Sequence, residues 1–237
     1  MPRVLAKDRL GSLLAANRRL HDPALEPRNR LPVLRALRRW QAARLRESFA
    51  DFLASPAQRP AAEFFLSDLY GDIDVSQRDR DVERVLPLMR RVLPARLLDV
   101  AADAIELAVL SQAFDLRMAE VLEPALGGAP IDTAAYAQAY RKVGCPRLRR
   151  RQVMLIHGIG VDLERAVSSP TIAALLRLSR GPARAAGLAE LQGFLERGFA
   201  AFRALGSASA FVEEIARREL EVSRRLFAGH PRPFAVR

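Results

Sequence analysis

The sequence predicts an all-α protein, and three observations lead to this fold class. Apolar residues recur at helical spacing along most of the 237 residues. Period-two runs and short Val/Ile/Tyr segments bounded by turns, which are typical of strands, are nearly absent. Hydrophobic residues make up 50% of the chain and charged residues 27%, the balance of a globular protein. We therefore expect a single-domain bundle of about eight or nine helices.

Three helices are expected in the N-terminal third of the chain. The first covers Val4–Leu20 and ends before Pro23, because proline does not continue a helix. The second covers Pro32–Leu53 and has proline in its first turn, where the missing N–H needs no partner. The third covers Ala61–Tyr70 and ends at Gly71, the residue type most frequent just after a helix.

The middle of the chain is expected to form a kinked helix and a long one. The fourth helix begins near Ser76, because Ser76-Gln77-Arg78-Asp79 resembles a capping box, and Pro87 should kink or split it. The fifth covers Ala95–Leu122 and is apolar around most of its circumference. Residues 123–131 follow as a loop with two glycines, a weak internal boundary within a single domain of residues 1–237.

The C-terminal part is expected to be helical almost throughout. Asp132 caps the sixth helix, which ends near Val143. Ser207 or Ser209 caps the last helix, which ends at Gly229 before an irregular tail. Between them the apolar spacing predicts helices over Pro146–Val167, Thr171–Ser179 and Pro182–Leu205.

The charge is divided unevenly along the chain. Residues 1–60 hold 13 Lys+Arg and 5 Asp+Glu, residues 61–130 hold 7 and 13, and residues 131–237 hold 18 and 9. The net charge of +11 is therefore the sum of two basic flanks and an acidic middle. The acidic residues gather at Asp72–Glu83 and on a stripe of the long helix that carries Asp99, Asp103 and Glu106. We expect the basic flanks to fold around this acidic centre.

Metal and cofactor sites find little support in the sequence. Bundle di-iron sites need a Glu-x-x-His motif, and the chain has none beside its acidic stripe. The segment Asp72–Glu83 has acidic or hydroxyl residues at four EF-hand ligand positions, but Gln77 occupies the position that needs glycine. We therefore predict no metal, no cofactor and no catalytic residue of a recognisable class.

The run Val153–Gly160 ends in His157-Gly158-Ile159-Gly160, which is similar to an oxyanion loop or to part of a dinucleotide fingerprint. The chain has no Gly-x-Ser-x-Gly elbow, and Leu163 stands where the third glycine of the fingerprint belongs. We expect a helix whose glycines allow a neighbouring helix to approach closely, and His157 as a satisfied core histidine. A loop that binds a ligand through His157 is the alternative.

Two basic clusters are candidates for anion binding. One surrounds the second helix from Arg28 to Arg46, and the other covers Arg141–Arg151 with Arg147, Arg149, Arg150 and Arg151 as candidate contacts. The chain has no zinc-finger spacing, and its 6% aromatic content is low for a base-stacking platform. Salt bridges to the acidic centre are the other explanation of both clusters.

The strings FFLSDLYG at Phe64–Gly71, SQRD at Ser76–Asp79 and VLP at Val85–Pro87 mark a resemblance to a known family. Over about residues 45–125 the chain resembles a family of uncharacterised all-helical proteins from proteobacteria. The resemblance implies helices and a bacterial source, and it implies no activity, cofactor or site residue. In physical terms, Arg78 or Arg80 is a candidate for a buried ion pair with Asp68 or Asp79, and the Tyr70 hydroxyl would need a partner if buried.

The chain carries no signal of export or membrane insertion. Its single cysteine, Cys145, cannot form an internal disulfide, which fits a reducing cytoplasm. The N-terminus lacks an apolar h-region, and no run of about 18 apolar residues occurs. We expect a soluble cytoplasmic protein.

These observations favour a non-catalytic binding or interaction protein that engages a protein partner or an apolar ligand through a groove between helices. A homodimer is compatible with such a bundle. One alternative is a protein that binds nucleic acid or another polyanion through the Arg141–Arg151 cluster. A second alternative is an enzyme or cofactor carrier with a site near Tyr70, Asp115 and His157.

Overall fold

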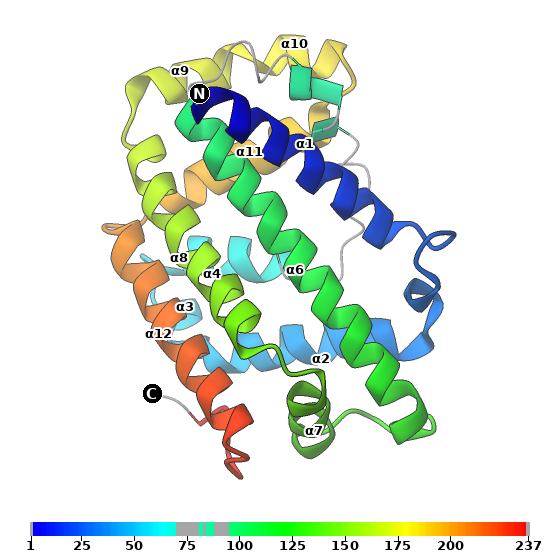
Figure 1. Cartoon of the computed structure of the whole chain (residues 1–237). Helices are drawn as coiled ribbons and strands as arrows, with labels where there is room; N and C mark the ends of the chain where they lie inside the picture. The colour runs from blue at the N-terminus through cyan, green and yellow to red at the C-terminus, as the bar shows by residue number, and fades with distance from the viewer. Residues whose placement is uncertain (1, 70–80, 83, 88–94, 236–237) are drawn as a thin grey trace.

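The helix α6 (Ala95–Leu126) runs through the centre of the molecule, and the other helices are arranged around it (Figure 1). The computed structural model describes residues 2–69, 81–82, 84–87 and 95–235. These residues contain eleven α-helices and two short helical turns, and no strand is found among them. The predicted all-α fold is confirmed. The helices outnumber the expected eight or nine because the structure breaks two of the predicted ones.

The N-terminal helices pack on α6. Helix α1 (Pro2–His21) lies along α6 and buries Leu10 and Leu14 against Leu98 and Ala102. A 3-10 turn, η1 (Pro27–Arg30), leads into α2 (Pro32–Ser48), which also contacts α6. The first turn of α2 has no side-chain cap of its own, and the Val33 N–H donates instead to Glu123 Oε2 of α6 at 3.0 Å.

The predicted helix Pro32–Leu53 is wrong beyond Ser48. The chain bends at Phe49 (φ −116°, ψ 27°), and a separate short helix, α3 (Ala50–Ala54), follows. The bend lets both Phe49 and Phe52 enter the core, where Phe52 meets Phe211 of the last helix with ring centroids 4.9 Å apart. Burial of the two aromatic rings stabilises the bend, and the Phe49 N–H still donates to the Leu45 carbonyl at 3.0 Å.

The next segment is described only in part. Helix α4 (Arg59–Phe64) continues into a π-helical turn, η2 (Phe65–Leu69), in agreement with the predicted helix as far as the structure describes it. Residues 81–82 and 84–87 are also helical. The expectations for Tyr70, Gly71, Ser76, Arg78 and most of the EF-hand-like segment lie outside the described residues.

The long helix extends four residues past its predicted end at Leu122, and Pro124 lies inside it. The extension places Glu123 where it receives the Val33 N–H and places Leu126 in the same cluster as Leu122. The loop expected over residues 123–131 is therefore shorter, and it connects α6 to the next helix between Leu126 and Thr133. Helices α7 (Thr133–Val143) and α8 (Pro146–Val167) match their predictions, and Asp132 caps α7 by accepting from the Ala135 N–H at 2.7 Å.

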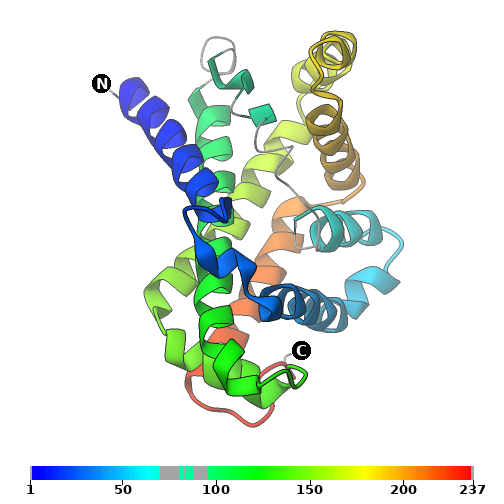
Figure 2. The same ribbon diagram turned by 90° about the vertical axis from the view of Figure 1, so that its right-hand side faces the viewer.

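The four C-terminal helices are α9 (Pro170–Leu178), α10 (Arg180–Ala185), α11 (Ala189–Arg203) and α12 (Ala208–Phe227). The predicted helix Pro182–Leu205 is wrong as a single element, because the chain turns at Gly187 with φ +71°. Ser207, not Ser209, caps α12. Helices α9 and α10 lie at the end of the molecule opposite α7 (Figures 1 and 2).

Helices α8 and α12 approach closely at a glycine, as the sequence predicts. A Cβ atom built on Gly160 would lie 2.2 Å from a methyl group of Val212, whereas one on Gly158 would have nothing within 4 Å. The irregular tail docks on the other end of the core, where the Phe234 ring packs edge-on against the stacked rings of Trp40 and Tyr136. None of the described helices is both long and apolar enough to cross a membrane.

Candidate functional site

The acidic stripe of α6 is paired with arginines from the basic flanks. Arg9 of α1 binds Asp103 at 2.6 Å and also contacts Glu106, which receives Arg151 of α8 at 2.8 Å. Further along α6, Arg28 binds Glu120 at 3.0 Å. These contacts confirm, for the stripe on α6, the prediction that basic flanks fold around an acidic centre; most of its other part, Asp72–Glu83, lies outside the described residues.

This pairing explains the electrostatics of the stripe. Hydrogen bonds from Arg151 and Arg9 lower the pKa of Glu106 below its usual value. A carboxylate stabilised in this way is a structural ion-pair partner rather than a proton donor near neutral pH. In the part of the chain that the structure describes, no group of three or more His, Cys, Asp or Glu side chains is placed to hold a metal ion.

Asp115, a predicted site residue, faces α2 from α6. Gln41 Nε2 donates to its Oδ1 at 3.2 Å, and Arg38 Nε lies 3.7 Å from its Oδ2. Burial raises the pKa of Asp115, against the opposing influence of Arg38, Gln41 and the buried Arg149. Asp115 therefore belongs to a polar seam inside the bundle.

The Arg141–Arg151 cluster does not form one continuous surface, which corrects the sequence-based picture. Arg149 is 5% exposed, and its guanidinium lies 3.6 Å from the Phe114 ring centroid and 4.2 Å from that of Tyr140. Arg151 is held by Glu106, while Arg147 and Arg150 are exposed. Two of the four candidate contacts are thus engaged with the protein itself.

The other predicted site residues are not brought together. His157 is half-buried on α8. Contacts from Gln152 to Ser111 and from Arg96 to Asp162 set the antiparallel register of α6 and α8. This register places His157 roughly three turns of α6 away from Asp115. Tyr70 and Arg78 lie outside the described residues, so the expected Tyr70–Asp115–His157 site gains no support.

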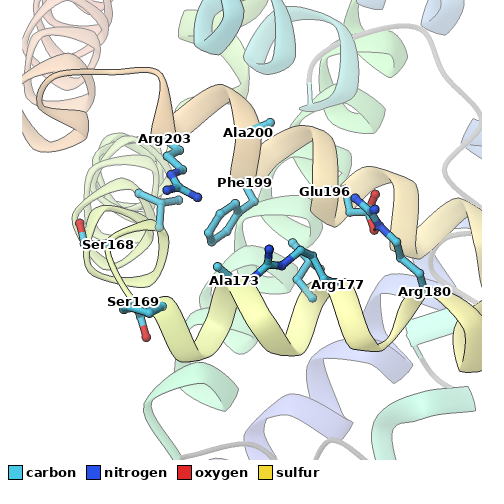
Figure 3. A pocket seen from close by; sticks show the side chains of 12 residues that line it. Ser168, Ser169, Ala173, Arg177, Arg180, Glu196, Phe199, Ala200 and Arg203 are labelled. Carbon is cyan, nitrogen blue, oxygen red and sulfur yellow. The ribbon is translucent and has the colours of Figure 1, made fainter.

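A groove between α9 and α11, next to the C-terminal end of α8, is the more promising site (Figure 3). We call it the α9–α11 groove; its volume is about 430 Å³. It is lined by Val167, Ser168, Ser169, Pro170, Ala173, Leu176, Arg177, Arg180, Glu196, Phe199, Ala200 and Arg203.

The groove combines an apolar wall with two arginines. Figure 3 shows Phe199 and Arg203 reaching from α11, and Arg177 from α9, toward the same hollow. Both arginines are exposed, and neither makes a hydrogen bond or ion pair with any residue that the structure describes. At one end, Arg180 Nε donates to Glu196 Oε1 at 2.6 Å, which lowers the pKa of Glu196.

A buried glutamine holds the two walls in place. Gln192 of α11 donates from Nε2 to the Leu176 carbonyl of α9 at 2.7 Å and accepts from the Ser179 hydroxyl at 3.0 Å. Ser169 caps α9 by accepting from the Ile172 N–H. Because Gln192 is only 8% exposed, these bonds are shielded from water and fix the spacing of the groove.

A second hollow, of about 660 Å³, lies between the start of α8 and α12. Arg150, Leu220, Ser223 and Phe227 are among its lining residues. Most of its arginines are paired along α12, as Arg224 and Arg225 are with Glu221. Because these arginines already bind carboxylates, the second hollow offers fewer unpaired positive charges to an anion than the α9–α11 groove does.

Sequence reasoning did not single out any residue of the α9–α11 groove. The available signal was the apolar segment Thr171–Leu178 in a region otherwise rich in arginine and alanine. Its helical spacing predicted a helix but did not reveal that the helix would stay uncovered.

Comparison with known proteins gives one match. Residues 20–233 match a protein family described as a domain of unknown function, DUF8198. Comparisons with curated proteins and with solved structures give no match.

Proposed function

The chain belongs to the DUF8198 family, a domain of unknown function, and we propose that it is a non-catalytic interaction protein whose α9–α11 groove binds a partner protein. A bacterial origin and a cytoplasmic location are part of this proposal. They rest on the resemblance of the Phe64–Gly71 segment and on the single cysteine, Cys145.

The observation that carries the proposal is the incomplete burial of α9. None of the nine residues of α9 is buried, although six of them are Ile, Leu or Ala. On the side of α9 that lines the groove, Ala173 and Leu176 are only partly buried, as is Phe199 on the facing wall of α11. A helix with apolar residues that its own chain leaves open is typical of a surface that a partner covers.

The alternatives have weaker support. A polyanion site over Arg141–Arg151 would lose Arg149 to the core and would compete with Glu106 for Arg151. An enzyme site would need a base close to a nucleophile, and Asp115 and His157 lie at different levels of the bundle.

Photocrosslinking in the host cell tests the proposal. A diazirine-bearing amino acid replaces Ala200, which is exposed at the groove, or Ala43, which is exposed on α2 as a matched control. We expect a discrete adduct with another protein from position 200 and none from position 43. The substitution Ala173→Trp, which fills the groove from α9, should remove the adduct.

The result can also contradict the proposal. Equal adducts from both positions, or an adduct that persists in the Ala173→Trp variant, would show that the groove is not the contact. An adduct only between two copies of this chain would replace the partner protein with a homodimer. The thermal unfolding of each variant should match that of the parent chain, because Ala43 and Ala200 are both exposed.

A further inference from the structure

We infer that the segment bound in the α9–α11 groove is an acidic amphipathic helix of the partner protein, with an apolar side chain on Phe199 and carboxylates on Arg177 and Arg203. The inference rests on the proposed function and adds the chemistry of the partner.

The region around the groove carries an excess of positive charge. Residues 170–205 hold five arginines and two glutamates. One of these glutamates, Glu196, is already bound to Arg180. Elsewhere in the described structure, arginines near a carboxylate use it, as Arg44 does with Glu219 and Arg218 with Asp51. The groove therefore presents positive charge that the chain does not neutralise and that suits carboxylates of a ligand.

The two unpaired arginines lie on opposite walls of the groove. Arg177 comes from α9 and Arg203 from α11, so the guanidinium groups approach the hollow from opposite walls (Figure 3). A guanidinium binds a carboxylate through two parallel N–H donors. An acidic helix lying in the groove can present carboxylates on both sides of one apolar stripe, since residues three and four apart share a face.

An apolar wall lies between the charged positions of the groove. Phe199, Ala173 and Leu176 line the groove between the charged positions. The free energy of the system falls when an apolar side chain of a ligand displaces water from residues of this kind. A purely ionic ligand would leave this wall uncovered, so an amphipathic segment fits better than an inorganic anion.

Two other occupants fit less well. A second copy that docked symmetrically through the same groove would bring its own Arg177 and Arg203 to the contact, and like charges would oppose it. A lipid surface would meet the exposed Leu175 and Leu178, but these lie on the side of α9 turned away from Ala173 and Arg180. The concave side is therefore assigned to a peptide segment.

Binding of three designed peptides tests the inference. Each has about 18 residues, long enough to form a helix when bound. All share one Leu/Phe stripe, and the flanking positions are Glu, Gln or Lys. Fluorescence anisotropy with the full chain should rank their affinities in the order Glu, Gln, Lys, and added salt should weaken binding of the Glu peptide.

Matched variants identify the contact. The double substitution Arg177→Gln/Arg203→Gln should weaken binding of the Glu peptide about fivefold or more and leave the Gln peptide unchanged. The control Arg35→Gln/Arg39→Gln removes the same charge from exposed positions of α2 and should leave both affinities unchanged.

Each other outcome overturns the inference. Equal affinity for the Glu and Gln peptides would show that the groove does not select acidic segments, while the crosslinking result would still stand. No binding of any peptide would reject an amphipathic helix as the occupant. Binding to phosphatidylglycerol vesicles that is lost in the Arg177→Gln/Arg203→Gln variant, without peptide binding, would assign the groove to an anionic membrane.

Discussion

At the scale of single residues, the contact between α8 and α12 depends on the absence of one side chain. The Cβ of an alanine at position 160 would lie within 2.8 Å of three atoms of Val212, whose Cβ itself cannot rotate away. We expect Gly160→Ala to lower the free energy of unfolding by about 1–3 kcal/mol through overpacking.

The matched control for that prediction lies on the same helix. A Cβ at Gly158 meets nothing within 4 Å, so Gly158→Ala should be neutral or should stabilise by up to about 1 kcal/mol through helix propensity. Urea denaturation of the two variants compares them directly. Equal losses in both would mean that α8 and α12 do not meet as closely as described.

Two carboxyl groups on α6 should respond to pH in opposite ways. Burial raises the pKa of Asp115, so its charge opposes folding at neutral pH and protonation relieves this as the pH falls. Arg151 and Arg9 lower the pKa of Glu106, so its charge favours folding at neutral pH, and this stability is lost as the pH falls through the folded pKa.

Thermal unfolding of two variants with an uncharged amide in place of the carboxyl group tests these opposite contributions to stability. At pH 7, Asp115→Asn should have a higher melting temperature than the parent chain, and Glu106→Gln a lower one. Each difference should correspond to about 1 kcal/mol of unfolding free energy. The Asp115 difference should shrink as the pH falls through the raised pKa of that group, whereas the Glu106 difference should persist to lower pH, until the pH falls through the lowered pKa of Glu106. Shifts in the same direction for both variants at pH 7 would refute the assignment.

At the scale of helices, Arg218 joins α12 to the bend after α2. Its guanidinium donates to Asp51 at 2.7 Å, to Glu214 at 2.7 Å and to the Ser48 carbonyl at 3.1 Å. It also lies 4.9 Å from the Phe52 ring centroid. The side chain is 13% exposed, so these contacts are largely shielded from solvent.

We expect Arg218→Lys to lose about 1–2 kcal/mol of unfolding free energy, since a lysine cannot reproduce the forked donors. Arg224→Lys is the control, because that side chain is 76% exposed and its loss should stay below about 0.5 kcal/mol. Chemical denaturation measures both. A similar small loss for the two would mean that Arg218 does not connect the helices.

The element boundaries show what the sequence could and could not predict. Asp132 and Pro146 predicted the starts of α7 and α8 because caps and first-turn prolines act locally. The bend at Phe49 was missed because the apolar spacing continues through Leu53, and the contacts that favour the bend come from the distant Phe211 and Arg218. Gly187 was read as part of a helix, although its positive φ ends α10.

The groove was missed for a related reason. Arg177 and Arg203 are separated by 26 positions, and their shared hollow exists only because Gln192 joins α9 to α11. Composition shows how many arginines the chain has, but not which ones lack a carboxylate in the fold. By contrast, the pairing of the acidic middle with the basic flanks was predictable, since it follows from the division of charge along the sequence.

At the scale of the whole molecule, the arginines divide into a paired part and an open part. The paired part includes arginines of α1, η1, α2 and α8 that meet the carboxylates of α6. The open part includes Arg177 and Arg203 in the α9–α11 groove. The stability of the bundle and its proposed binding surface therefore use different arginines, so each can be varied without the other.

This division predicts how the fold fails in acid. Hydrogen bonds from Arg217 lower the pKa of Glu214 to about 2, and those from Arg224 lower that of Glu221 to about 2. The stability from such lowered groups is complete above their ordinary value of 4.5 and is lost as the pH falls toward 2. Below that range the 38 Lys and Arg charges repel one another with no carboxylates opposite them.

We therefore expect the chain to lose its fixed tertiary packing between about pH 4 and pH 2, because protonation removes the ion pairs while every guanidinium stays charged. Near-ultraviolet circular dichroism across this range measures the transition. The Arg177→Gln/Arg203→Gln variant should unfold at the same pH or slightly lower, since it loses positive charge and no internal pair. A transition that moves to higher pH in this variant would mean that these two arginines hold carboxylates inside the fold, and the α9–α11 groove would then lose its argument from charge.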